Sequence, residues 1–402
     1  MTIRGTADAW VGNELRILKK ADVPFRLHAL YRSEQNYFEA GTVADIAAGT
    51  QFLRPVNPLL VLLFTLAGPV LFGGRFFAAL WNAFTGKRES LRVRIVGLWH
   101  FCLGCYWAAQ LRKEDVSHIH SQWIHSAGTV AMFGAWLAGK PFSFTGHAAD
   151  LFRERAALYD KIQRADFIIC ISEFHRQFYV ENGADPAKMR VAYCGIDTSV
   201  FTPKRRVRPE GEPVHILSSG RLVEKKGFAV LIEACRIMQA ANYPFRCTIG
   251  GSGPDEAELR LQVAEAGLDE FVHLTGEAIK QEDIPDFMYT GDIYCLPCVW
   301  AKDNDVDGLP QMLMEAMACG LPAVSTRLVG IPDLVIDAET GLLVEPEDAG
   351  ALADALMRLS EDDALAQLLA HNGRKRVVDV FDIDVCLEPL LAEYHTALET
   401  PS

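Results

Sequence analysis

Two carboxylates, Asp307 and Glu315, stand eight residues apart in the stretch DGLPQMLMEAMACGLP. Pro310 suits the first turn of a helix, and Gly320 and Pro322 suit its end. The spacing therefore places Asp307 on the entry loop and Glu315 about a turn and a half into the helix, with both side chains able to face one cleft. Carboxylate oxygens accept hydrogen bonds, so the pair is suited to hold the hydroxyl groups of a sugar or a ribose.

The entry of this helix, formed by Gly308, Leu309 and Pro310, is a second chemical feature of the same stretch. The first turn of a helix presents backbone N–H groups without partners and the positive end of the helix dipole, which together suit a phosphate or another anionic oxygen. A structural alternative stays open, with Asp307 as a helix cap and Glu315 as a solvated side chain.

Arg221 and Lys226, in the loop GRLVEKKG, supply positive charge. The loop follows the apolar run VHILSSG and precedes an amphipathic run, so both cations are predicted at the carboxyl end of a strand, where open α/β sheets bind ligands. Two cations five residues apart on such a loop are able to neutralise a departing diphosphate without a metal. The alternative is an ordinary solvated lysine-rich loop.

These residues need a parallel sheet to position them, and the second half of the chain predicts one. Strands are predicted at VHILSSG, FRCTIGG, FVHLTG and DIYCLPCV, and helices at FAVLIEACRIMQA and DEAELRLQVAEAG. This alternation is typical of βαβ units and a doubly wound sheet. The first half shows the same rhythm more weakly at VSHIHSQW, KPFSFTGH and DFIICIS. The fold class is therefore α/β, with two Rossmann-like doubly wound domains in tandem.

The length of 402 residues agrees with two domains, at about 100 to 200 residues per domain. We predict an N-terminal domain over 1–203, a C-terminal domain over 204–380, and a C-terminal helix over 381–402 that crosses back to the first domain. The joint is predicted in the turn-rich, basic stretch from Thr202 to Pro213, which contains three prolines and no periodicity.

The composition limits the classes of protein and partner. Half of the residues are hydrophobic, which excludes a disordered or low-complexity protein. The net charge of −13 argues against nucleic acid as a partner, but residues 1–204 hold 23 Lys and Arg against 17 Asp and Glu, whereas the remainder holds 16 against 35. Only one half is therefore expected to face an anionic surface or ligand. Ten cysteines, mostly in apolar runs, and no secretory signal favour free thiols in a reducing cytoplasm.

An apolar segment over 56–84 does not fit the strand and helix alternation. It opens with VNPLLVLLFTLAGPVLFGG, 19 residues without a charge, which reaches the length of a membrane-spanning helix. Gly68-Pro69 and Gly73-Gly74 interrupt the helical hydrogen bonding and favour a bent helical hairpin in the membrane interface. A pair of core helices and a true span remain the alternatives. The cations expected on lipid headgroups are Arg75, Lys87, Arg88, Arg92 and Arg94.

The runs GRLVEKKGFAVLIEA, IGGSGPDEAEL, DIYCLPCV and DGLPQMLMEAMACGLPAVSTRLVGIPDLV, in this order and spacing, resemble the retaining GT-B glycosyltransferases of family 4, especially bacterial exopolysaccharide and colanic-acid-type enzymes. The resemblance covers nearly the whole C-terminal half. It continues more loosely in AWVGNELRILKKADVPFRLHALYR, HIHSQWIHS, FSFTGHAADLF, DFIICISEF and YCGIDTSVF. It implies a GT-B fold with a cleft between two Rossmann-like domains, and retaining hexosyl transfer from a nucleotide-sugar to an acceptor. The domain over 1–203 would then bind the acceptor, and the domain over 204–380 would bind the nucleotide-sugar.

The resemblance also implies roles for single residues. Arg221 and Lys226 would bind the donor diphosphate, and Glu315 the ribose hydroxyls. Asp307, with the backbone of Gly308 to Pro310, would hold the transferred sugar. His147, in TGHAAD, matches the histidine that the family places beside the donor sugar, which makes His147 and Asp307 the catalytic candidates. From the residues alone, a core histidine at a strand end is the alternative for His147.

Three features depart from the family's pattern. The family usually has glutamate where Asp307 stands, so this side chain is one methylene shorter and donor choice or rate is expected to differ. The opening MTIRGTADAW is too short for the family's first strand and glycine loop, which indicates a truncated or misplaced start. The motif GHAAD is looser than the usual histidine motif.

Two motifs imitate metal sites. Asp303, Asp305 and Asp307 resemble the start of a calcium loop, but its twelfth position falls on Met314, which argues against calcium. Two C-x-x-C pairs lie in apolar runs nearly two hundred residues apart, which favours buried thiols over zinc. We expect no metal and no cofactor, with a UDP- or GDP-linked sugar as the donor substrate.

The sequence thus predicts a cytoplasmic enzyme, peripheral on the cytoplasmic face of the inner membrane, that extends a lipid-linked saccharide in cell-surface polysaccharide biosynthesis. Two alternatives remain. One is another GT-B enzyme, such as a nucleotide-sugar epimerase or a phosphorylase, and the other is a non-catalytic, membrane-associated scaffold.

Overall fold

The computed structural model describes residues 1–6, 9–33, 41–153, 155–204 and 206–399. The chain divides into two compact units, unit 1 (Met1–Tyr193 with Leu387–Ser402) and unit 2 (Cys194–Cys386). The boundaries that the sequence predicts, after residues 203 and 380, lie within ten residues of these divisions.

Unit 2 contains a six-stranded parallel sheet with the strand order β12-β11-β10-β7-β8-β9. Ile216 in the central strand lies opposite Ile293 of one neighbour and Cys247 of the other. All six residues of β7 are buried, including the polar His215, Ser218 and Ser219, which is typical of a strand covered on both faces. The strands are β7 (Val214–Ser219), β8 (Phe245–Gly250), β9 (Val272–Leu274), β10 (Ile293–Leu296), β11 (Ala323–Thr326) and β12 (Leu342–Val344).

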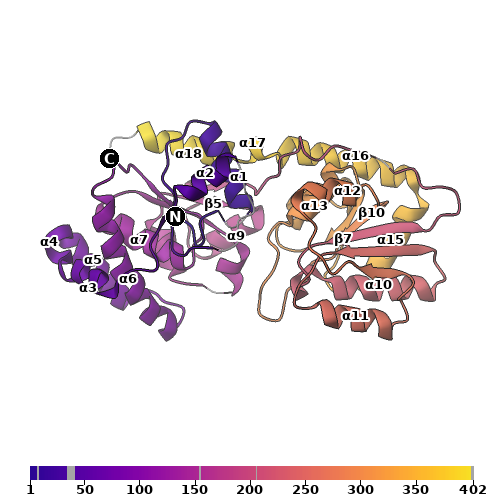
Figure 1. Ribbon diagram of the computed structural model, residues 1–402, viewed down its shortest axis with the longest axis horizontal. Coiled ribbons are helices and arrows are strands. Elements are labelled where there is room, and N and C mark those ends of the chain that lie inside the picture. The colour runs from indigo at the N-terminus through magenta and orange to yellow at the C-terminus, as the bar shows by residue number, and fades with distance from the viewer. Residues whose placement is uncertain (7–8, 34–40, 154, 205, 400–402) are drawn as a thin grey trace. The chain divides into compact units, whose positions relative to one another are not determined.

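Helices cover both faces of this sheet, with α10 and α11 on one side and α13 and α16 on the other (Figure 1). The predicted helix FAVLIEACRIMQA coincides with α10, and the doubly wound arrangement predicted for the second half is confirmed. The helices are α10 (Phe228–Ala240), α11 (Glu256–Glu265), α12 (Ile284–Met288), α13 (Gln311–Ala318), α14 (Ile331–Leu334), α15 (Ala349–Glu361), α16 (Asp363–Val380) and α17 (Ile383–Cys386).

Glycines let the loops after the central strands of unit 2 pack backbone against backbone. A Cβ on Gly251, after β8, would lie 1.9 Å from the carbonyl oxygen of Gly220, after β7. Gly227, at φ +72, would place a Cβ 1.7 Å from the carbonyl oxygen of Pro297, after β10. Because no side chain fits at these positions, the three loops stay in direct contact at the carboxyl edge of the sheet.

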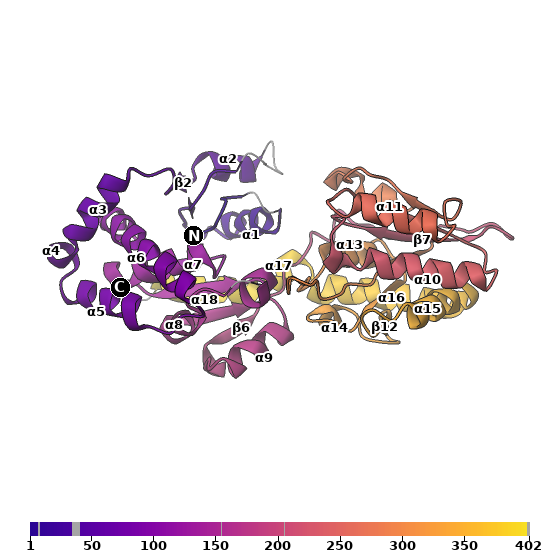
Figure 2. The same ribbon diagram turned by 90° about the horizontal axis from the view of Figure 1, so that it is seen from below.

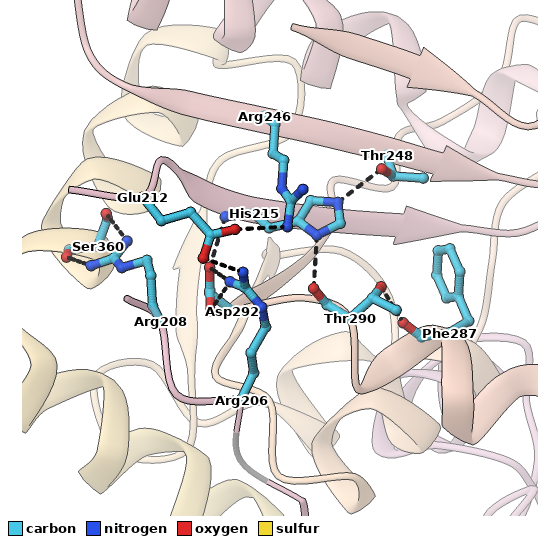
Figure 3. Close-up of polar contacts among 10 residues, drawn as sticks. All are labelled: Arg206, Arg208, Glu212, His215, Arg246, Thr248, Phe287, Thr290, Asp292 and Ser360. Carbon is cyan, nitrogen blue, oxygen red and sulfur yellow. Dashed lines mark hydrogen bonds and ion pairs between the residues drawn. The ribbon is translucent and has the colours of Figure 1, made fainter. Parts of the chain in front are cut away.

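The segment before β7 is fixed to the opposite edge of the same sheet (Figure 3). The Arg206 guanidinium contacts the Asp292 carboxylate at 2.9 Å and that of Glu212 at 2.5 Å. Asp292 also accepts a hydrogen bond from the backbone N–H of His215 at 2.8 Å, and Arg246 contacts Glu212 at 3.3 Å. The basic stretch predicted as the joint between domains is therefore held on unit 2 by ion pairs.

Unit 1 contains a four-stranded parallel sheet, β3-β4-β5-β6, and a parallel pair, β1-β2. The first residues join the two: the N–H of Thr2 donates to the carbonyl of His28 in β1, and the carbonyl of Met1 accepts from Gln122 after β3, both at 2.9 Å. The opening MTIRGTADAW, predicted to be too short for a strand, forms an isolated parallel bridge with β1 instead. The strands are β1 (His28–Ala29), β2 (Gln51–Phe52), β3 (Ile119–Ser121), β4 (Phe142–Gly146), β5 (Phe167–Cys170) and β6 (Met189–Val191).

The helices of unit 1 include one from the end of the chain. In α18, Leu391 and Tyr394 pack against a core cluster that contains Val11, Leu15 and Leu18 of α1. The helices are α1 (Ala9–Lys20), α2 (Thr42–Ala48), α3 (Pro58–Leu66), α4 (Gly68–Phe72), α5 (Gly74–Thr85), α6 (Leu91–Leu111), α7 (Ser126–Ala138), α8 (Leu158–Arg164), α9 (Glu173–Glu181) and α18 (Glu388–Glu399). A short π-helix covers Ala149–Arg153.

The apolar segment forms three consecutive helices, α3, α4 and α5, which lie together beside α6 at one edge of unit 1 in both views (Figures 1 and 2). The chain bends at Gly68, where a Cβ would lie 2.3 Å from the Phe76 ring. Val61 and Phe76 are buried, but much of the remaining apolar surface is not, and Trp81 is 72% exposed. No helix among the described residues is both long and apolar enough to cross a membrane. The exposed apolar residues of α3 to α5 are Leu59, Leu60, Leu62, Leu63, Leu66, Val70, Phe77, Trp81 and Phe84.

Candidate functional site

Asp307 of unit 2 lies among lysines at the carboxyl edge of the sheet. The Lys226 ammonium is 2.5 Å from Asp307 Oδ2, and the Lys225 ammonium is 3.1 Å from Oδ1. Lys225 also contacts Asp305 at 3.2 Å. The structure therefore brings together Lys226 and Asp307, two of the predicted site residues, which are 81 positions apart in the sequence.

The charges of this group are coupled. Burial alone would raise the pKa of Asp307, but the positive charges of Lys226 and Lys225 outweigh it and lower the pKa below its ordinary value. For Lys226, burial favours the neutral form, whereas the Asp307 carboxylate raises its pKa overall. Each partner thus keeps the other ionised, and Asp307 is a permanent acceptor at physiological pH.

Glu315, in α13, is 4% exposed and has only half of its carboxylate satisfied. Its Oε1 accepts a hydrogen bond from Gln281 Nε2 at 3.2 Å, whereas Oε2 has no partner among the described residues. Burial raises the pKa of Glu315 to about 7, against smaller opposing effects of Gln281 and Lys226. A buried carboxylate oxygen without a partner is costly, and a hydroxyl group of a ligand would satisfy it.

The entry of α13 differs in detail from the prediction. Pro310 is the N-cap residue rather than part of the first turn, and no side chain caps the helix, so Asp307 is not a helix cap. Gly308 and Leu309 are buried, and neither backbone N–H donates a hydrogen bond within the described part of the chain. Their unsatisfied N–H groups and the ion-paired Asp307 favour a binding loop over a structural cap.

Arg221 is not part of this group. It directly follows Gly220 after β7, where the sequence predicts it, but its side chain is exposed. Within the residues that the structure describes, it makes no hydrogen bond or ion pair and acts electrostatically on Asp255. Its donor-binding role stays a prediction.

His147 of unit 1 directly follows β4 and is enclosed by two tryptophans. Its ring centroid is 4.0 Å from that of Trp10 and 4.9 Å from that of Trp123. Burial lowers the pKa of His147 to about 3, the charge of His175 adds to this, and a hydrogen bond with the backbone of Gln122 opposes it. The imidazole is therefore neutral at physiological pH, and its Nε2 has no hydrogen-bond partner among the described residues.

The turn that carries Trp123 is held by two buried titratable side chains. Asp150, three residues after His147, accepts a hydrogen bond from the N–H of Ile124 at 3.0 Å. The fully buried Lys161 donates to the carbonyls of Ile124 and His125. The backbone N–H and C=O of Ile124 are thereby both fixed, which positions the adjacent Trp123 against the His147 ring.

Four residues that contact the candidates were not predicted from the sequence. Lys225 directly precedes Lys226 in the EKKG run. Because Lys226 was already a candidate, its position next to that residue was a signal that could have identified Lys225. Trp10 and Trp123 lie in the loosely matching runs of the first half. Their contacts with the His147 ring are given only weakly by the sequence. Gln281 lies 34 positions before Glu315 in a polar loop, and nothing in the sequence indicates their contact.

The residues that imitate metal sites have other partners. Asp305 and Asp307 pair with lysines, as described above. All ten cysteines are free thiols, and eight of them are buried. Burial raises the pKa of Cys295 and Cys298, so both stay protonated at neutral pH.

Two protein families match consecutive parts of the chain. The family described as "Glycosyltransferase Family 4" matches residues 88–200. The family described as "Glycosyl transferases group 1" matches residues 201–376, which include all the candidate residues of unit 2. His147 lies in the first match.

Curated relatives match a little more than half of the chain. The amylovoran biosynthesis glycosyltransferase AmsK of Erwinia amylovora is 38% identical over 250 residues, which are 61% of each protein. The putative colanic acid biosynthesis glycosyltransferase WcaL of Escherichia coli (strain K12) is 38% identical over 225 residues, or 56% of this chain and 55% of that protein. The matched region thus spans between half and two thirds of these relatives.

Solved structures match the whole chain at low identity. A glycosyltransferase from Rickettsia africae ESF-5 has a TM-score of 0.71 at 16% identity, covering 100% of this chain and 98% of that one. Anabaena Alr3699/HepE, solved in complex with UDP and glucose, has a TM-score of 0.65 at 17% identity and covers 98% of both chains. At these identities the likeness concerns the fold alone.

Proposed function

Because the chain belongs to the glycosyltransferases of group 1 and family 4 and has their GT-B fold, we propose that it transfers a hexosyl group from a nucleotide-sugar to a saccharide acceptor with retention of configuration. We assign this transfer to the synthesis of a cell-surface polysaccharide. The names of two relatives, which refer to amylovoran and colanic acid biosynthesis, support that assignment.

The observation that carries the proposal is a group of polar atoms in unit 2 that have no partner among the described residues. Glu315 offers a buried carboxylate oxygen and Gly308 and Leu309 offer two N–H groups, while Asp307 stays ionised beside Lys226. A nucleotide-sugar presents ribose hydroxyls, phosphate oxygens and sugar hydroxyls, which are the complementary groups. Glu315 binds the ribose, the N–H groups bind an anionic oxygen, and Asp307 holds the transferred sugar.

The departing diphosphate is stabilised by Arg221 and Lys226. Lys226 is already ionised, since Asp307 raises its pKa, and so it is prepared to stabilise charge that develops on the leaving oxygen. Arg221 is exposed and forms no ion pair among the described residues, although its charge acts on Asp255, so its guanidinium N–H groups are available to the donor. No metal or cofactor is part of this proposal, and the donor is UDP- or GDP-linked.

His147 contacts the transferred sugar as a neutral group. With a pKa of about 3 it does not act as a cationic acid, but its free Nε2 is able to exchange a hydrogen bond with a sugar hydroxyl. Trp10 and Trp123 keep the ring in place, so this contact requires little reorganisation.

The acceptor is lipid-linked, and unit 1 binds the cytoplasmic face of the inner membrane. The exposed apolar side chains of α3 to α5 support this proposal, since such a surface is unfavourable in water and suits a bilayer interface. Lys87 and Arg92, which follow this surface, are exposed cations on the half of the chain with excess positive charge. Arg88, which the sequence also assigned to lipid headgroups, is instead buried in an ion pair with Asp160.

The test is turnover of UDP- and GDP-linked hexoses with and without a lipid-linked saccharide acceptor. A transferase releases nucleotide quickly only with the acceptor, and NMR of the new linkage reports whether the anomeric configuration is retained. An epimerase would convert the donor without an acceptor, and a scaffold would leave the donor unchanged. Either of these outcomes refutes the proposal.

A further inference from the structure

A cavity of about 210 Å³ lies in unit 1, away from His147 and its tryptophans. Its walls come from the turn between α5 and α6, from α8 and the residues before it, and from the end of α9. The lining includes three cations, Lys87, Arg88 and Arg155, with Glu89 and Tyr159.

Two of the charged lining residues are committed to structural partners. Arg88 forms a buried ion pair with Asp160 of α8. The Glu89 carboxylate accepts hydrogen bonds from the backbone N–H groups of Ala157 and Leu158 at 2.8 and 2.9 Å. These contacts fix the α5–α6 turn to α8 and so give the cavity a defined wall.

The other two cations have no acidic partner within the described residues. The Lys87 ammonium lies 3.9 Å from the centroid of the Tyr159 ring, a contact that leaves its N–H donors available. Arg155 donates from Nε to the carbonyl of Leu151 at 2.6 Å and stacks over Phe178, which leaves its terminal nitrogens free. The cavity therefore has an excess of positive charge and of donors, the combination that binds a phosphate group.

The position of the cavity indicates where the phosphate comes from. Residues 87–89 lie in the turn between α5 and α6. Exposed apolar side chains lie on both sides of this turn, Trp81 and Phe84 at the end of α5 and Leu91 and Ile95 at the start of α6, and each is more than half exposed. An anion-binding cavity between apolar side chains matches a lipid, which has a phosphate directly above its hydrocarbon chains.

We propose that this cavity binds the phosphate group of a lipid, either a membrane headgroup or the phosphate of the lipid-linked acceptor. The proposal rests on the membrane-associated function above and adds a defined site to it. The Lys87 ammonium contributes a positive charge, and the terminal nitrogens of Arg155 donate two hydrogen bonds to the phosphate. The exposed Trp81 and Phe84 insert into the membrane interface.

The test compares vesicle binding of the full chain and of Lys87→Gln/Arg155→Gln. Three kinds of phosphatidylcholine vesicle are used: without additive, with about 5 mol % phosphatidylglycerol, and with the same share of a prenyl diphosphate. At this low anionic content diffuse attraction is small, so a site with two cations dominates. The double variant should bind the vesicles that contain a phosphate additive about tenfold or more weakly than the unmodified chain, because it loses charge-assisted hydrogen bonds.

Arg92→Gln/Arg94→Gln is the matched control, since it removes two cations on the adjoining turn of α6. Loss confined to prenyl diphosphate vesicles identifies the acceptor phosphate, and equal loss with both additives identifies any headgroup phosphate. An equal effect of the two double variants, or no vesicle binding by the unmodified chain, overturns the proposal. Lys87→Gln alone, at an exposed residue, serves if the double variant unfolds. Donor hydrolysis measured without lipid reports separately on the proposed function.

Discussion

Replacement of Glu315 by glutamine is expected to change both stability and nucleotide binding. Burial raises the pKa of Glu315 from 4.5 to about 7, so the folded chain favours the protonated form. A raised carboxyl pKa contributes stability that is fully present below pH 4.5 and is lost as the pH rises through 7. A shift of this size corresponds to about 3 kcal/mol between the two limits.

Urea unfolding of the full chain at several pH values between 5 and 8 measures this effect. Glu315→Gln cannot ionise, so the free energy of unfolding of the wild type should fall relative to the variant by up to about 3 kcal/mol across this range. Glu361→Gln, at an exposed position at the end of α15, is the control and should follow the wild type. If the curves for Glu315→Gln and the wild type run parallel, Glu315 is not a protonated buried acid.

Calorimetry with UDP and GDP then tests the ribose role. Ribose hydroxyls would donate to the charged carboxylate, so binding should lower the pKa of Glu315 and release protons near pH 6. Glu315→Gln should bind the preferred nucleotide about 10- to 100-fold more weakly, the range for a hydrogen bond to a charged group. Unchanged affinity, or wild-type binding without proton release, would refute the assignment even if the stability result holds.

Three further predictions concern the other residues. Lys226→Ala and Arg221→Ala should each lower kcat/KM by about two to four orders of magnitude, with activity that persists in EDTA; full rates in both variants would contradict their role at the diphosphate. His147→Phe keeps the packing between the tryptophans and should lower kcat while nucleotide affinity, measured by calorimetry, stays within about twofold. Because the pKa of His147 is about 3, no titration of this residue should appear in the kcat profile between pH 5 and 8. In sedimentation with anionic vesicles, serine substitutions on the exposed face of α3 should abolish binding without weakening nucleotide binding, whereas serines at the exposed Leu261 and Leu368 of unit 2 should have no effect. The α3 positions to change together are Leu59, Leu62, Leu63 and Leu66.

The elements of unit 2 were easier to predict from the sequence than those of unit 1, for a physical reason. In unit 2 the strands β7, β10 and β11 are buried on both faces and α10 is amphipathic, so apolar runs and helical periodicity mark these elements directly. In unit 1 the strands are short: β1 has two residues, and Thr2 joins it only through a parallel bridge. Pairing of such short strands depends on the neighbouring strands and on burial, and a local sequence pattern shows neither.

The site shows the same division. Lys226 and Asp307 were identified by motif, and their ion pair agrees with adjacent loops at one sheet edge. Arg221 was placed on the right loop, but its side-chain position depends on solvation and not on spacing. The contact of Gln281 with Glu315 and the tryptophans around His147 arise from tertiary packing, and residue types alone do not determine such contacts.

The contribution of α18 to unit 1 has a consequence for synthesis on the ribosome. Leu391 and Tyr394 cover α1, and Glu393 pairs with Arg190 at 2.7 Å, yet these residues are translated after all of unit 2. Unit 1 begins to emerge first and is completed last, so the apolar face of α1 stays uncovered while nearly two hundred further residues are added. A premature stop codon shortly before residue 387 would therefore leave α1 uncovered and destabilise unit 1, whereas unit 2 would keep nearly all of its residues.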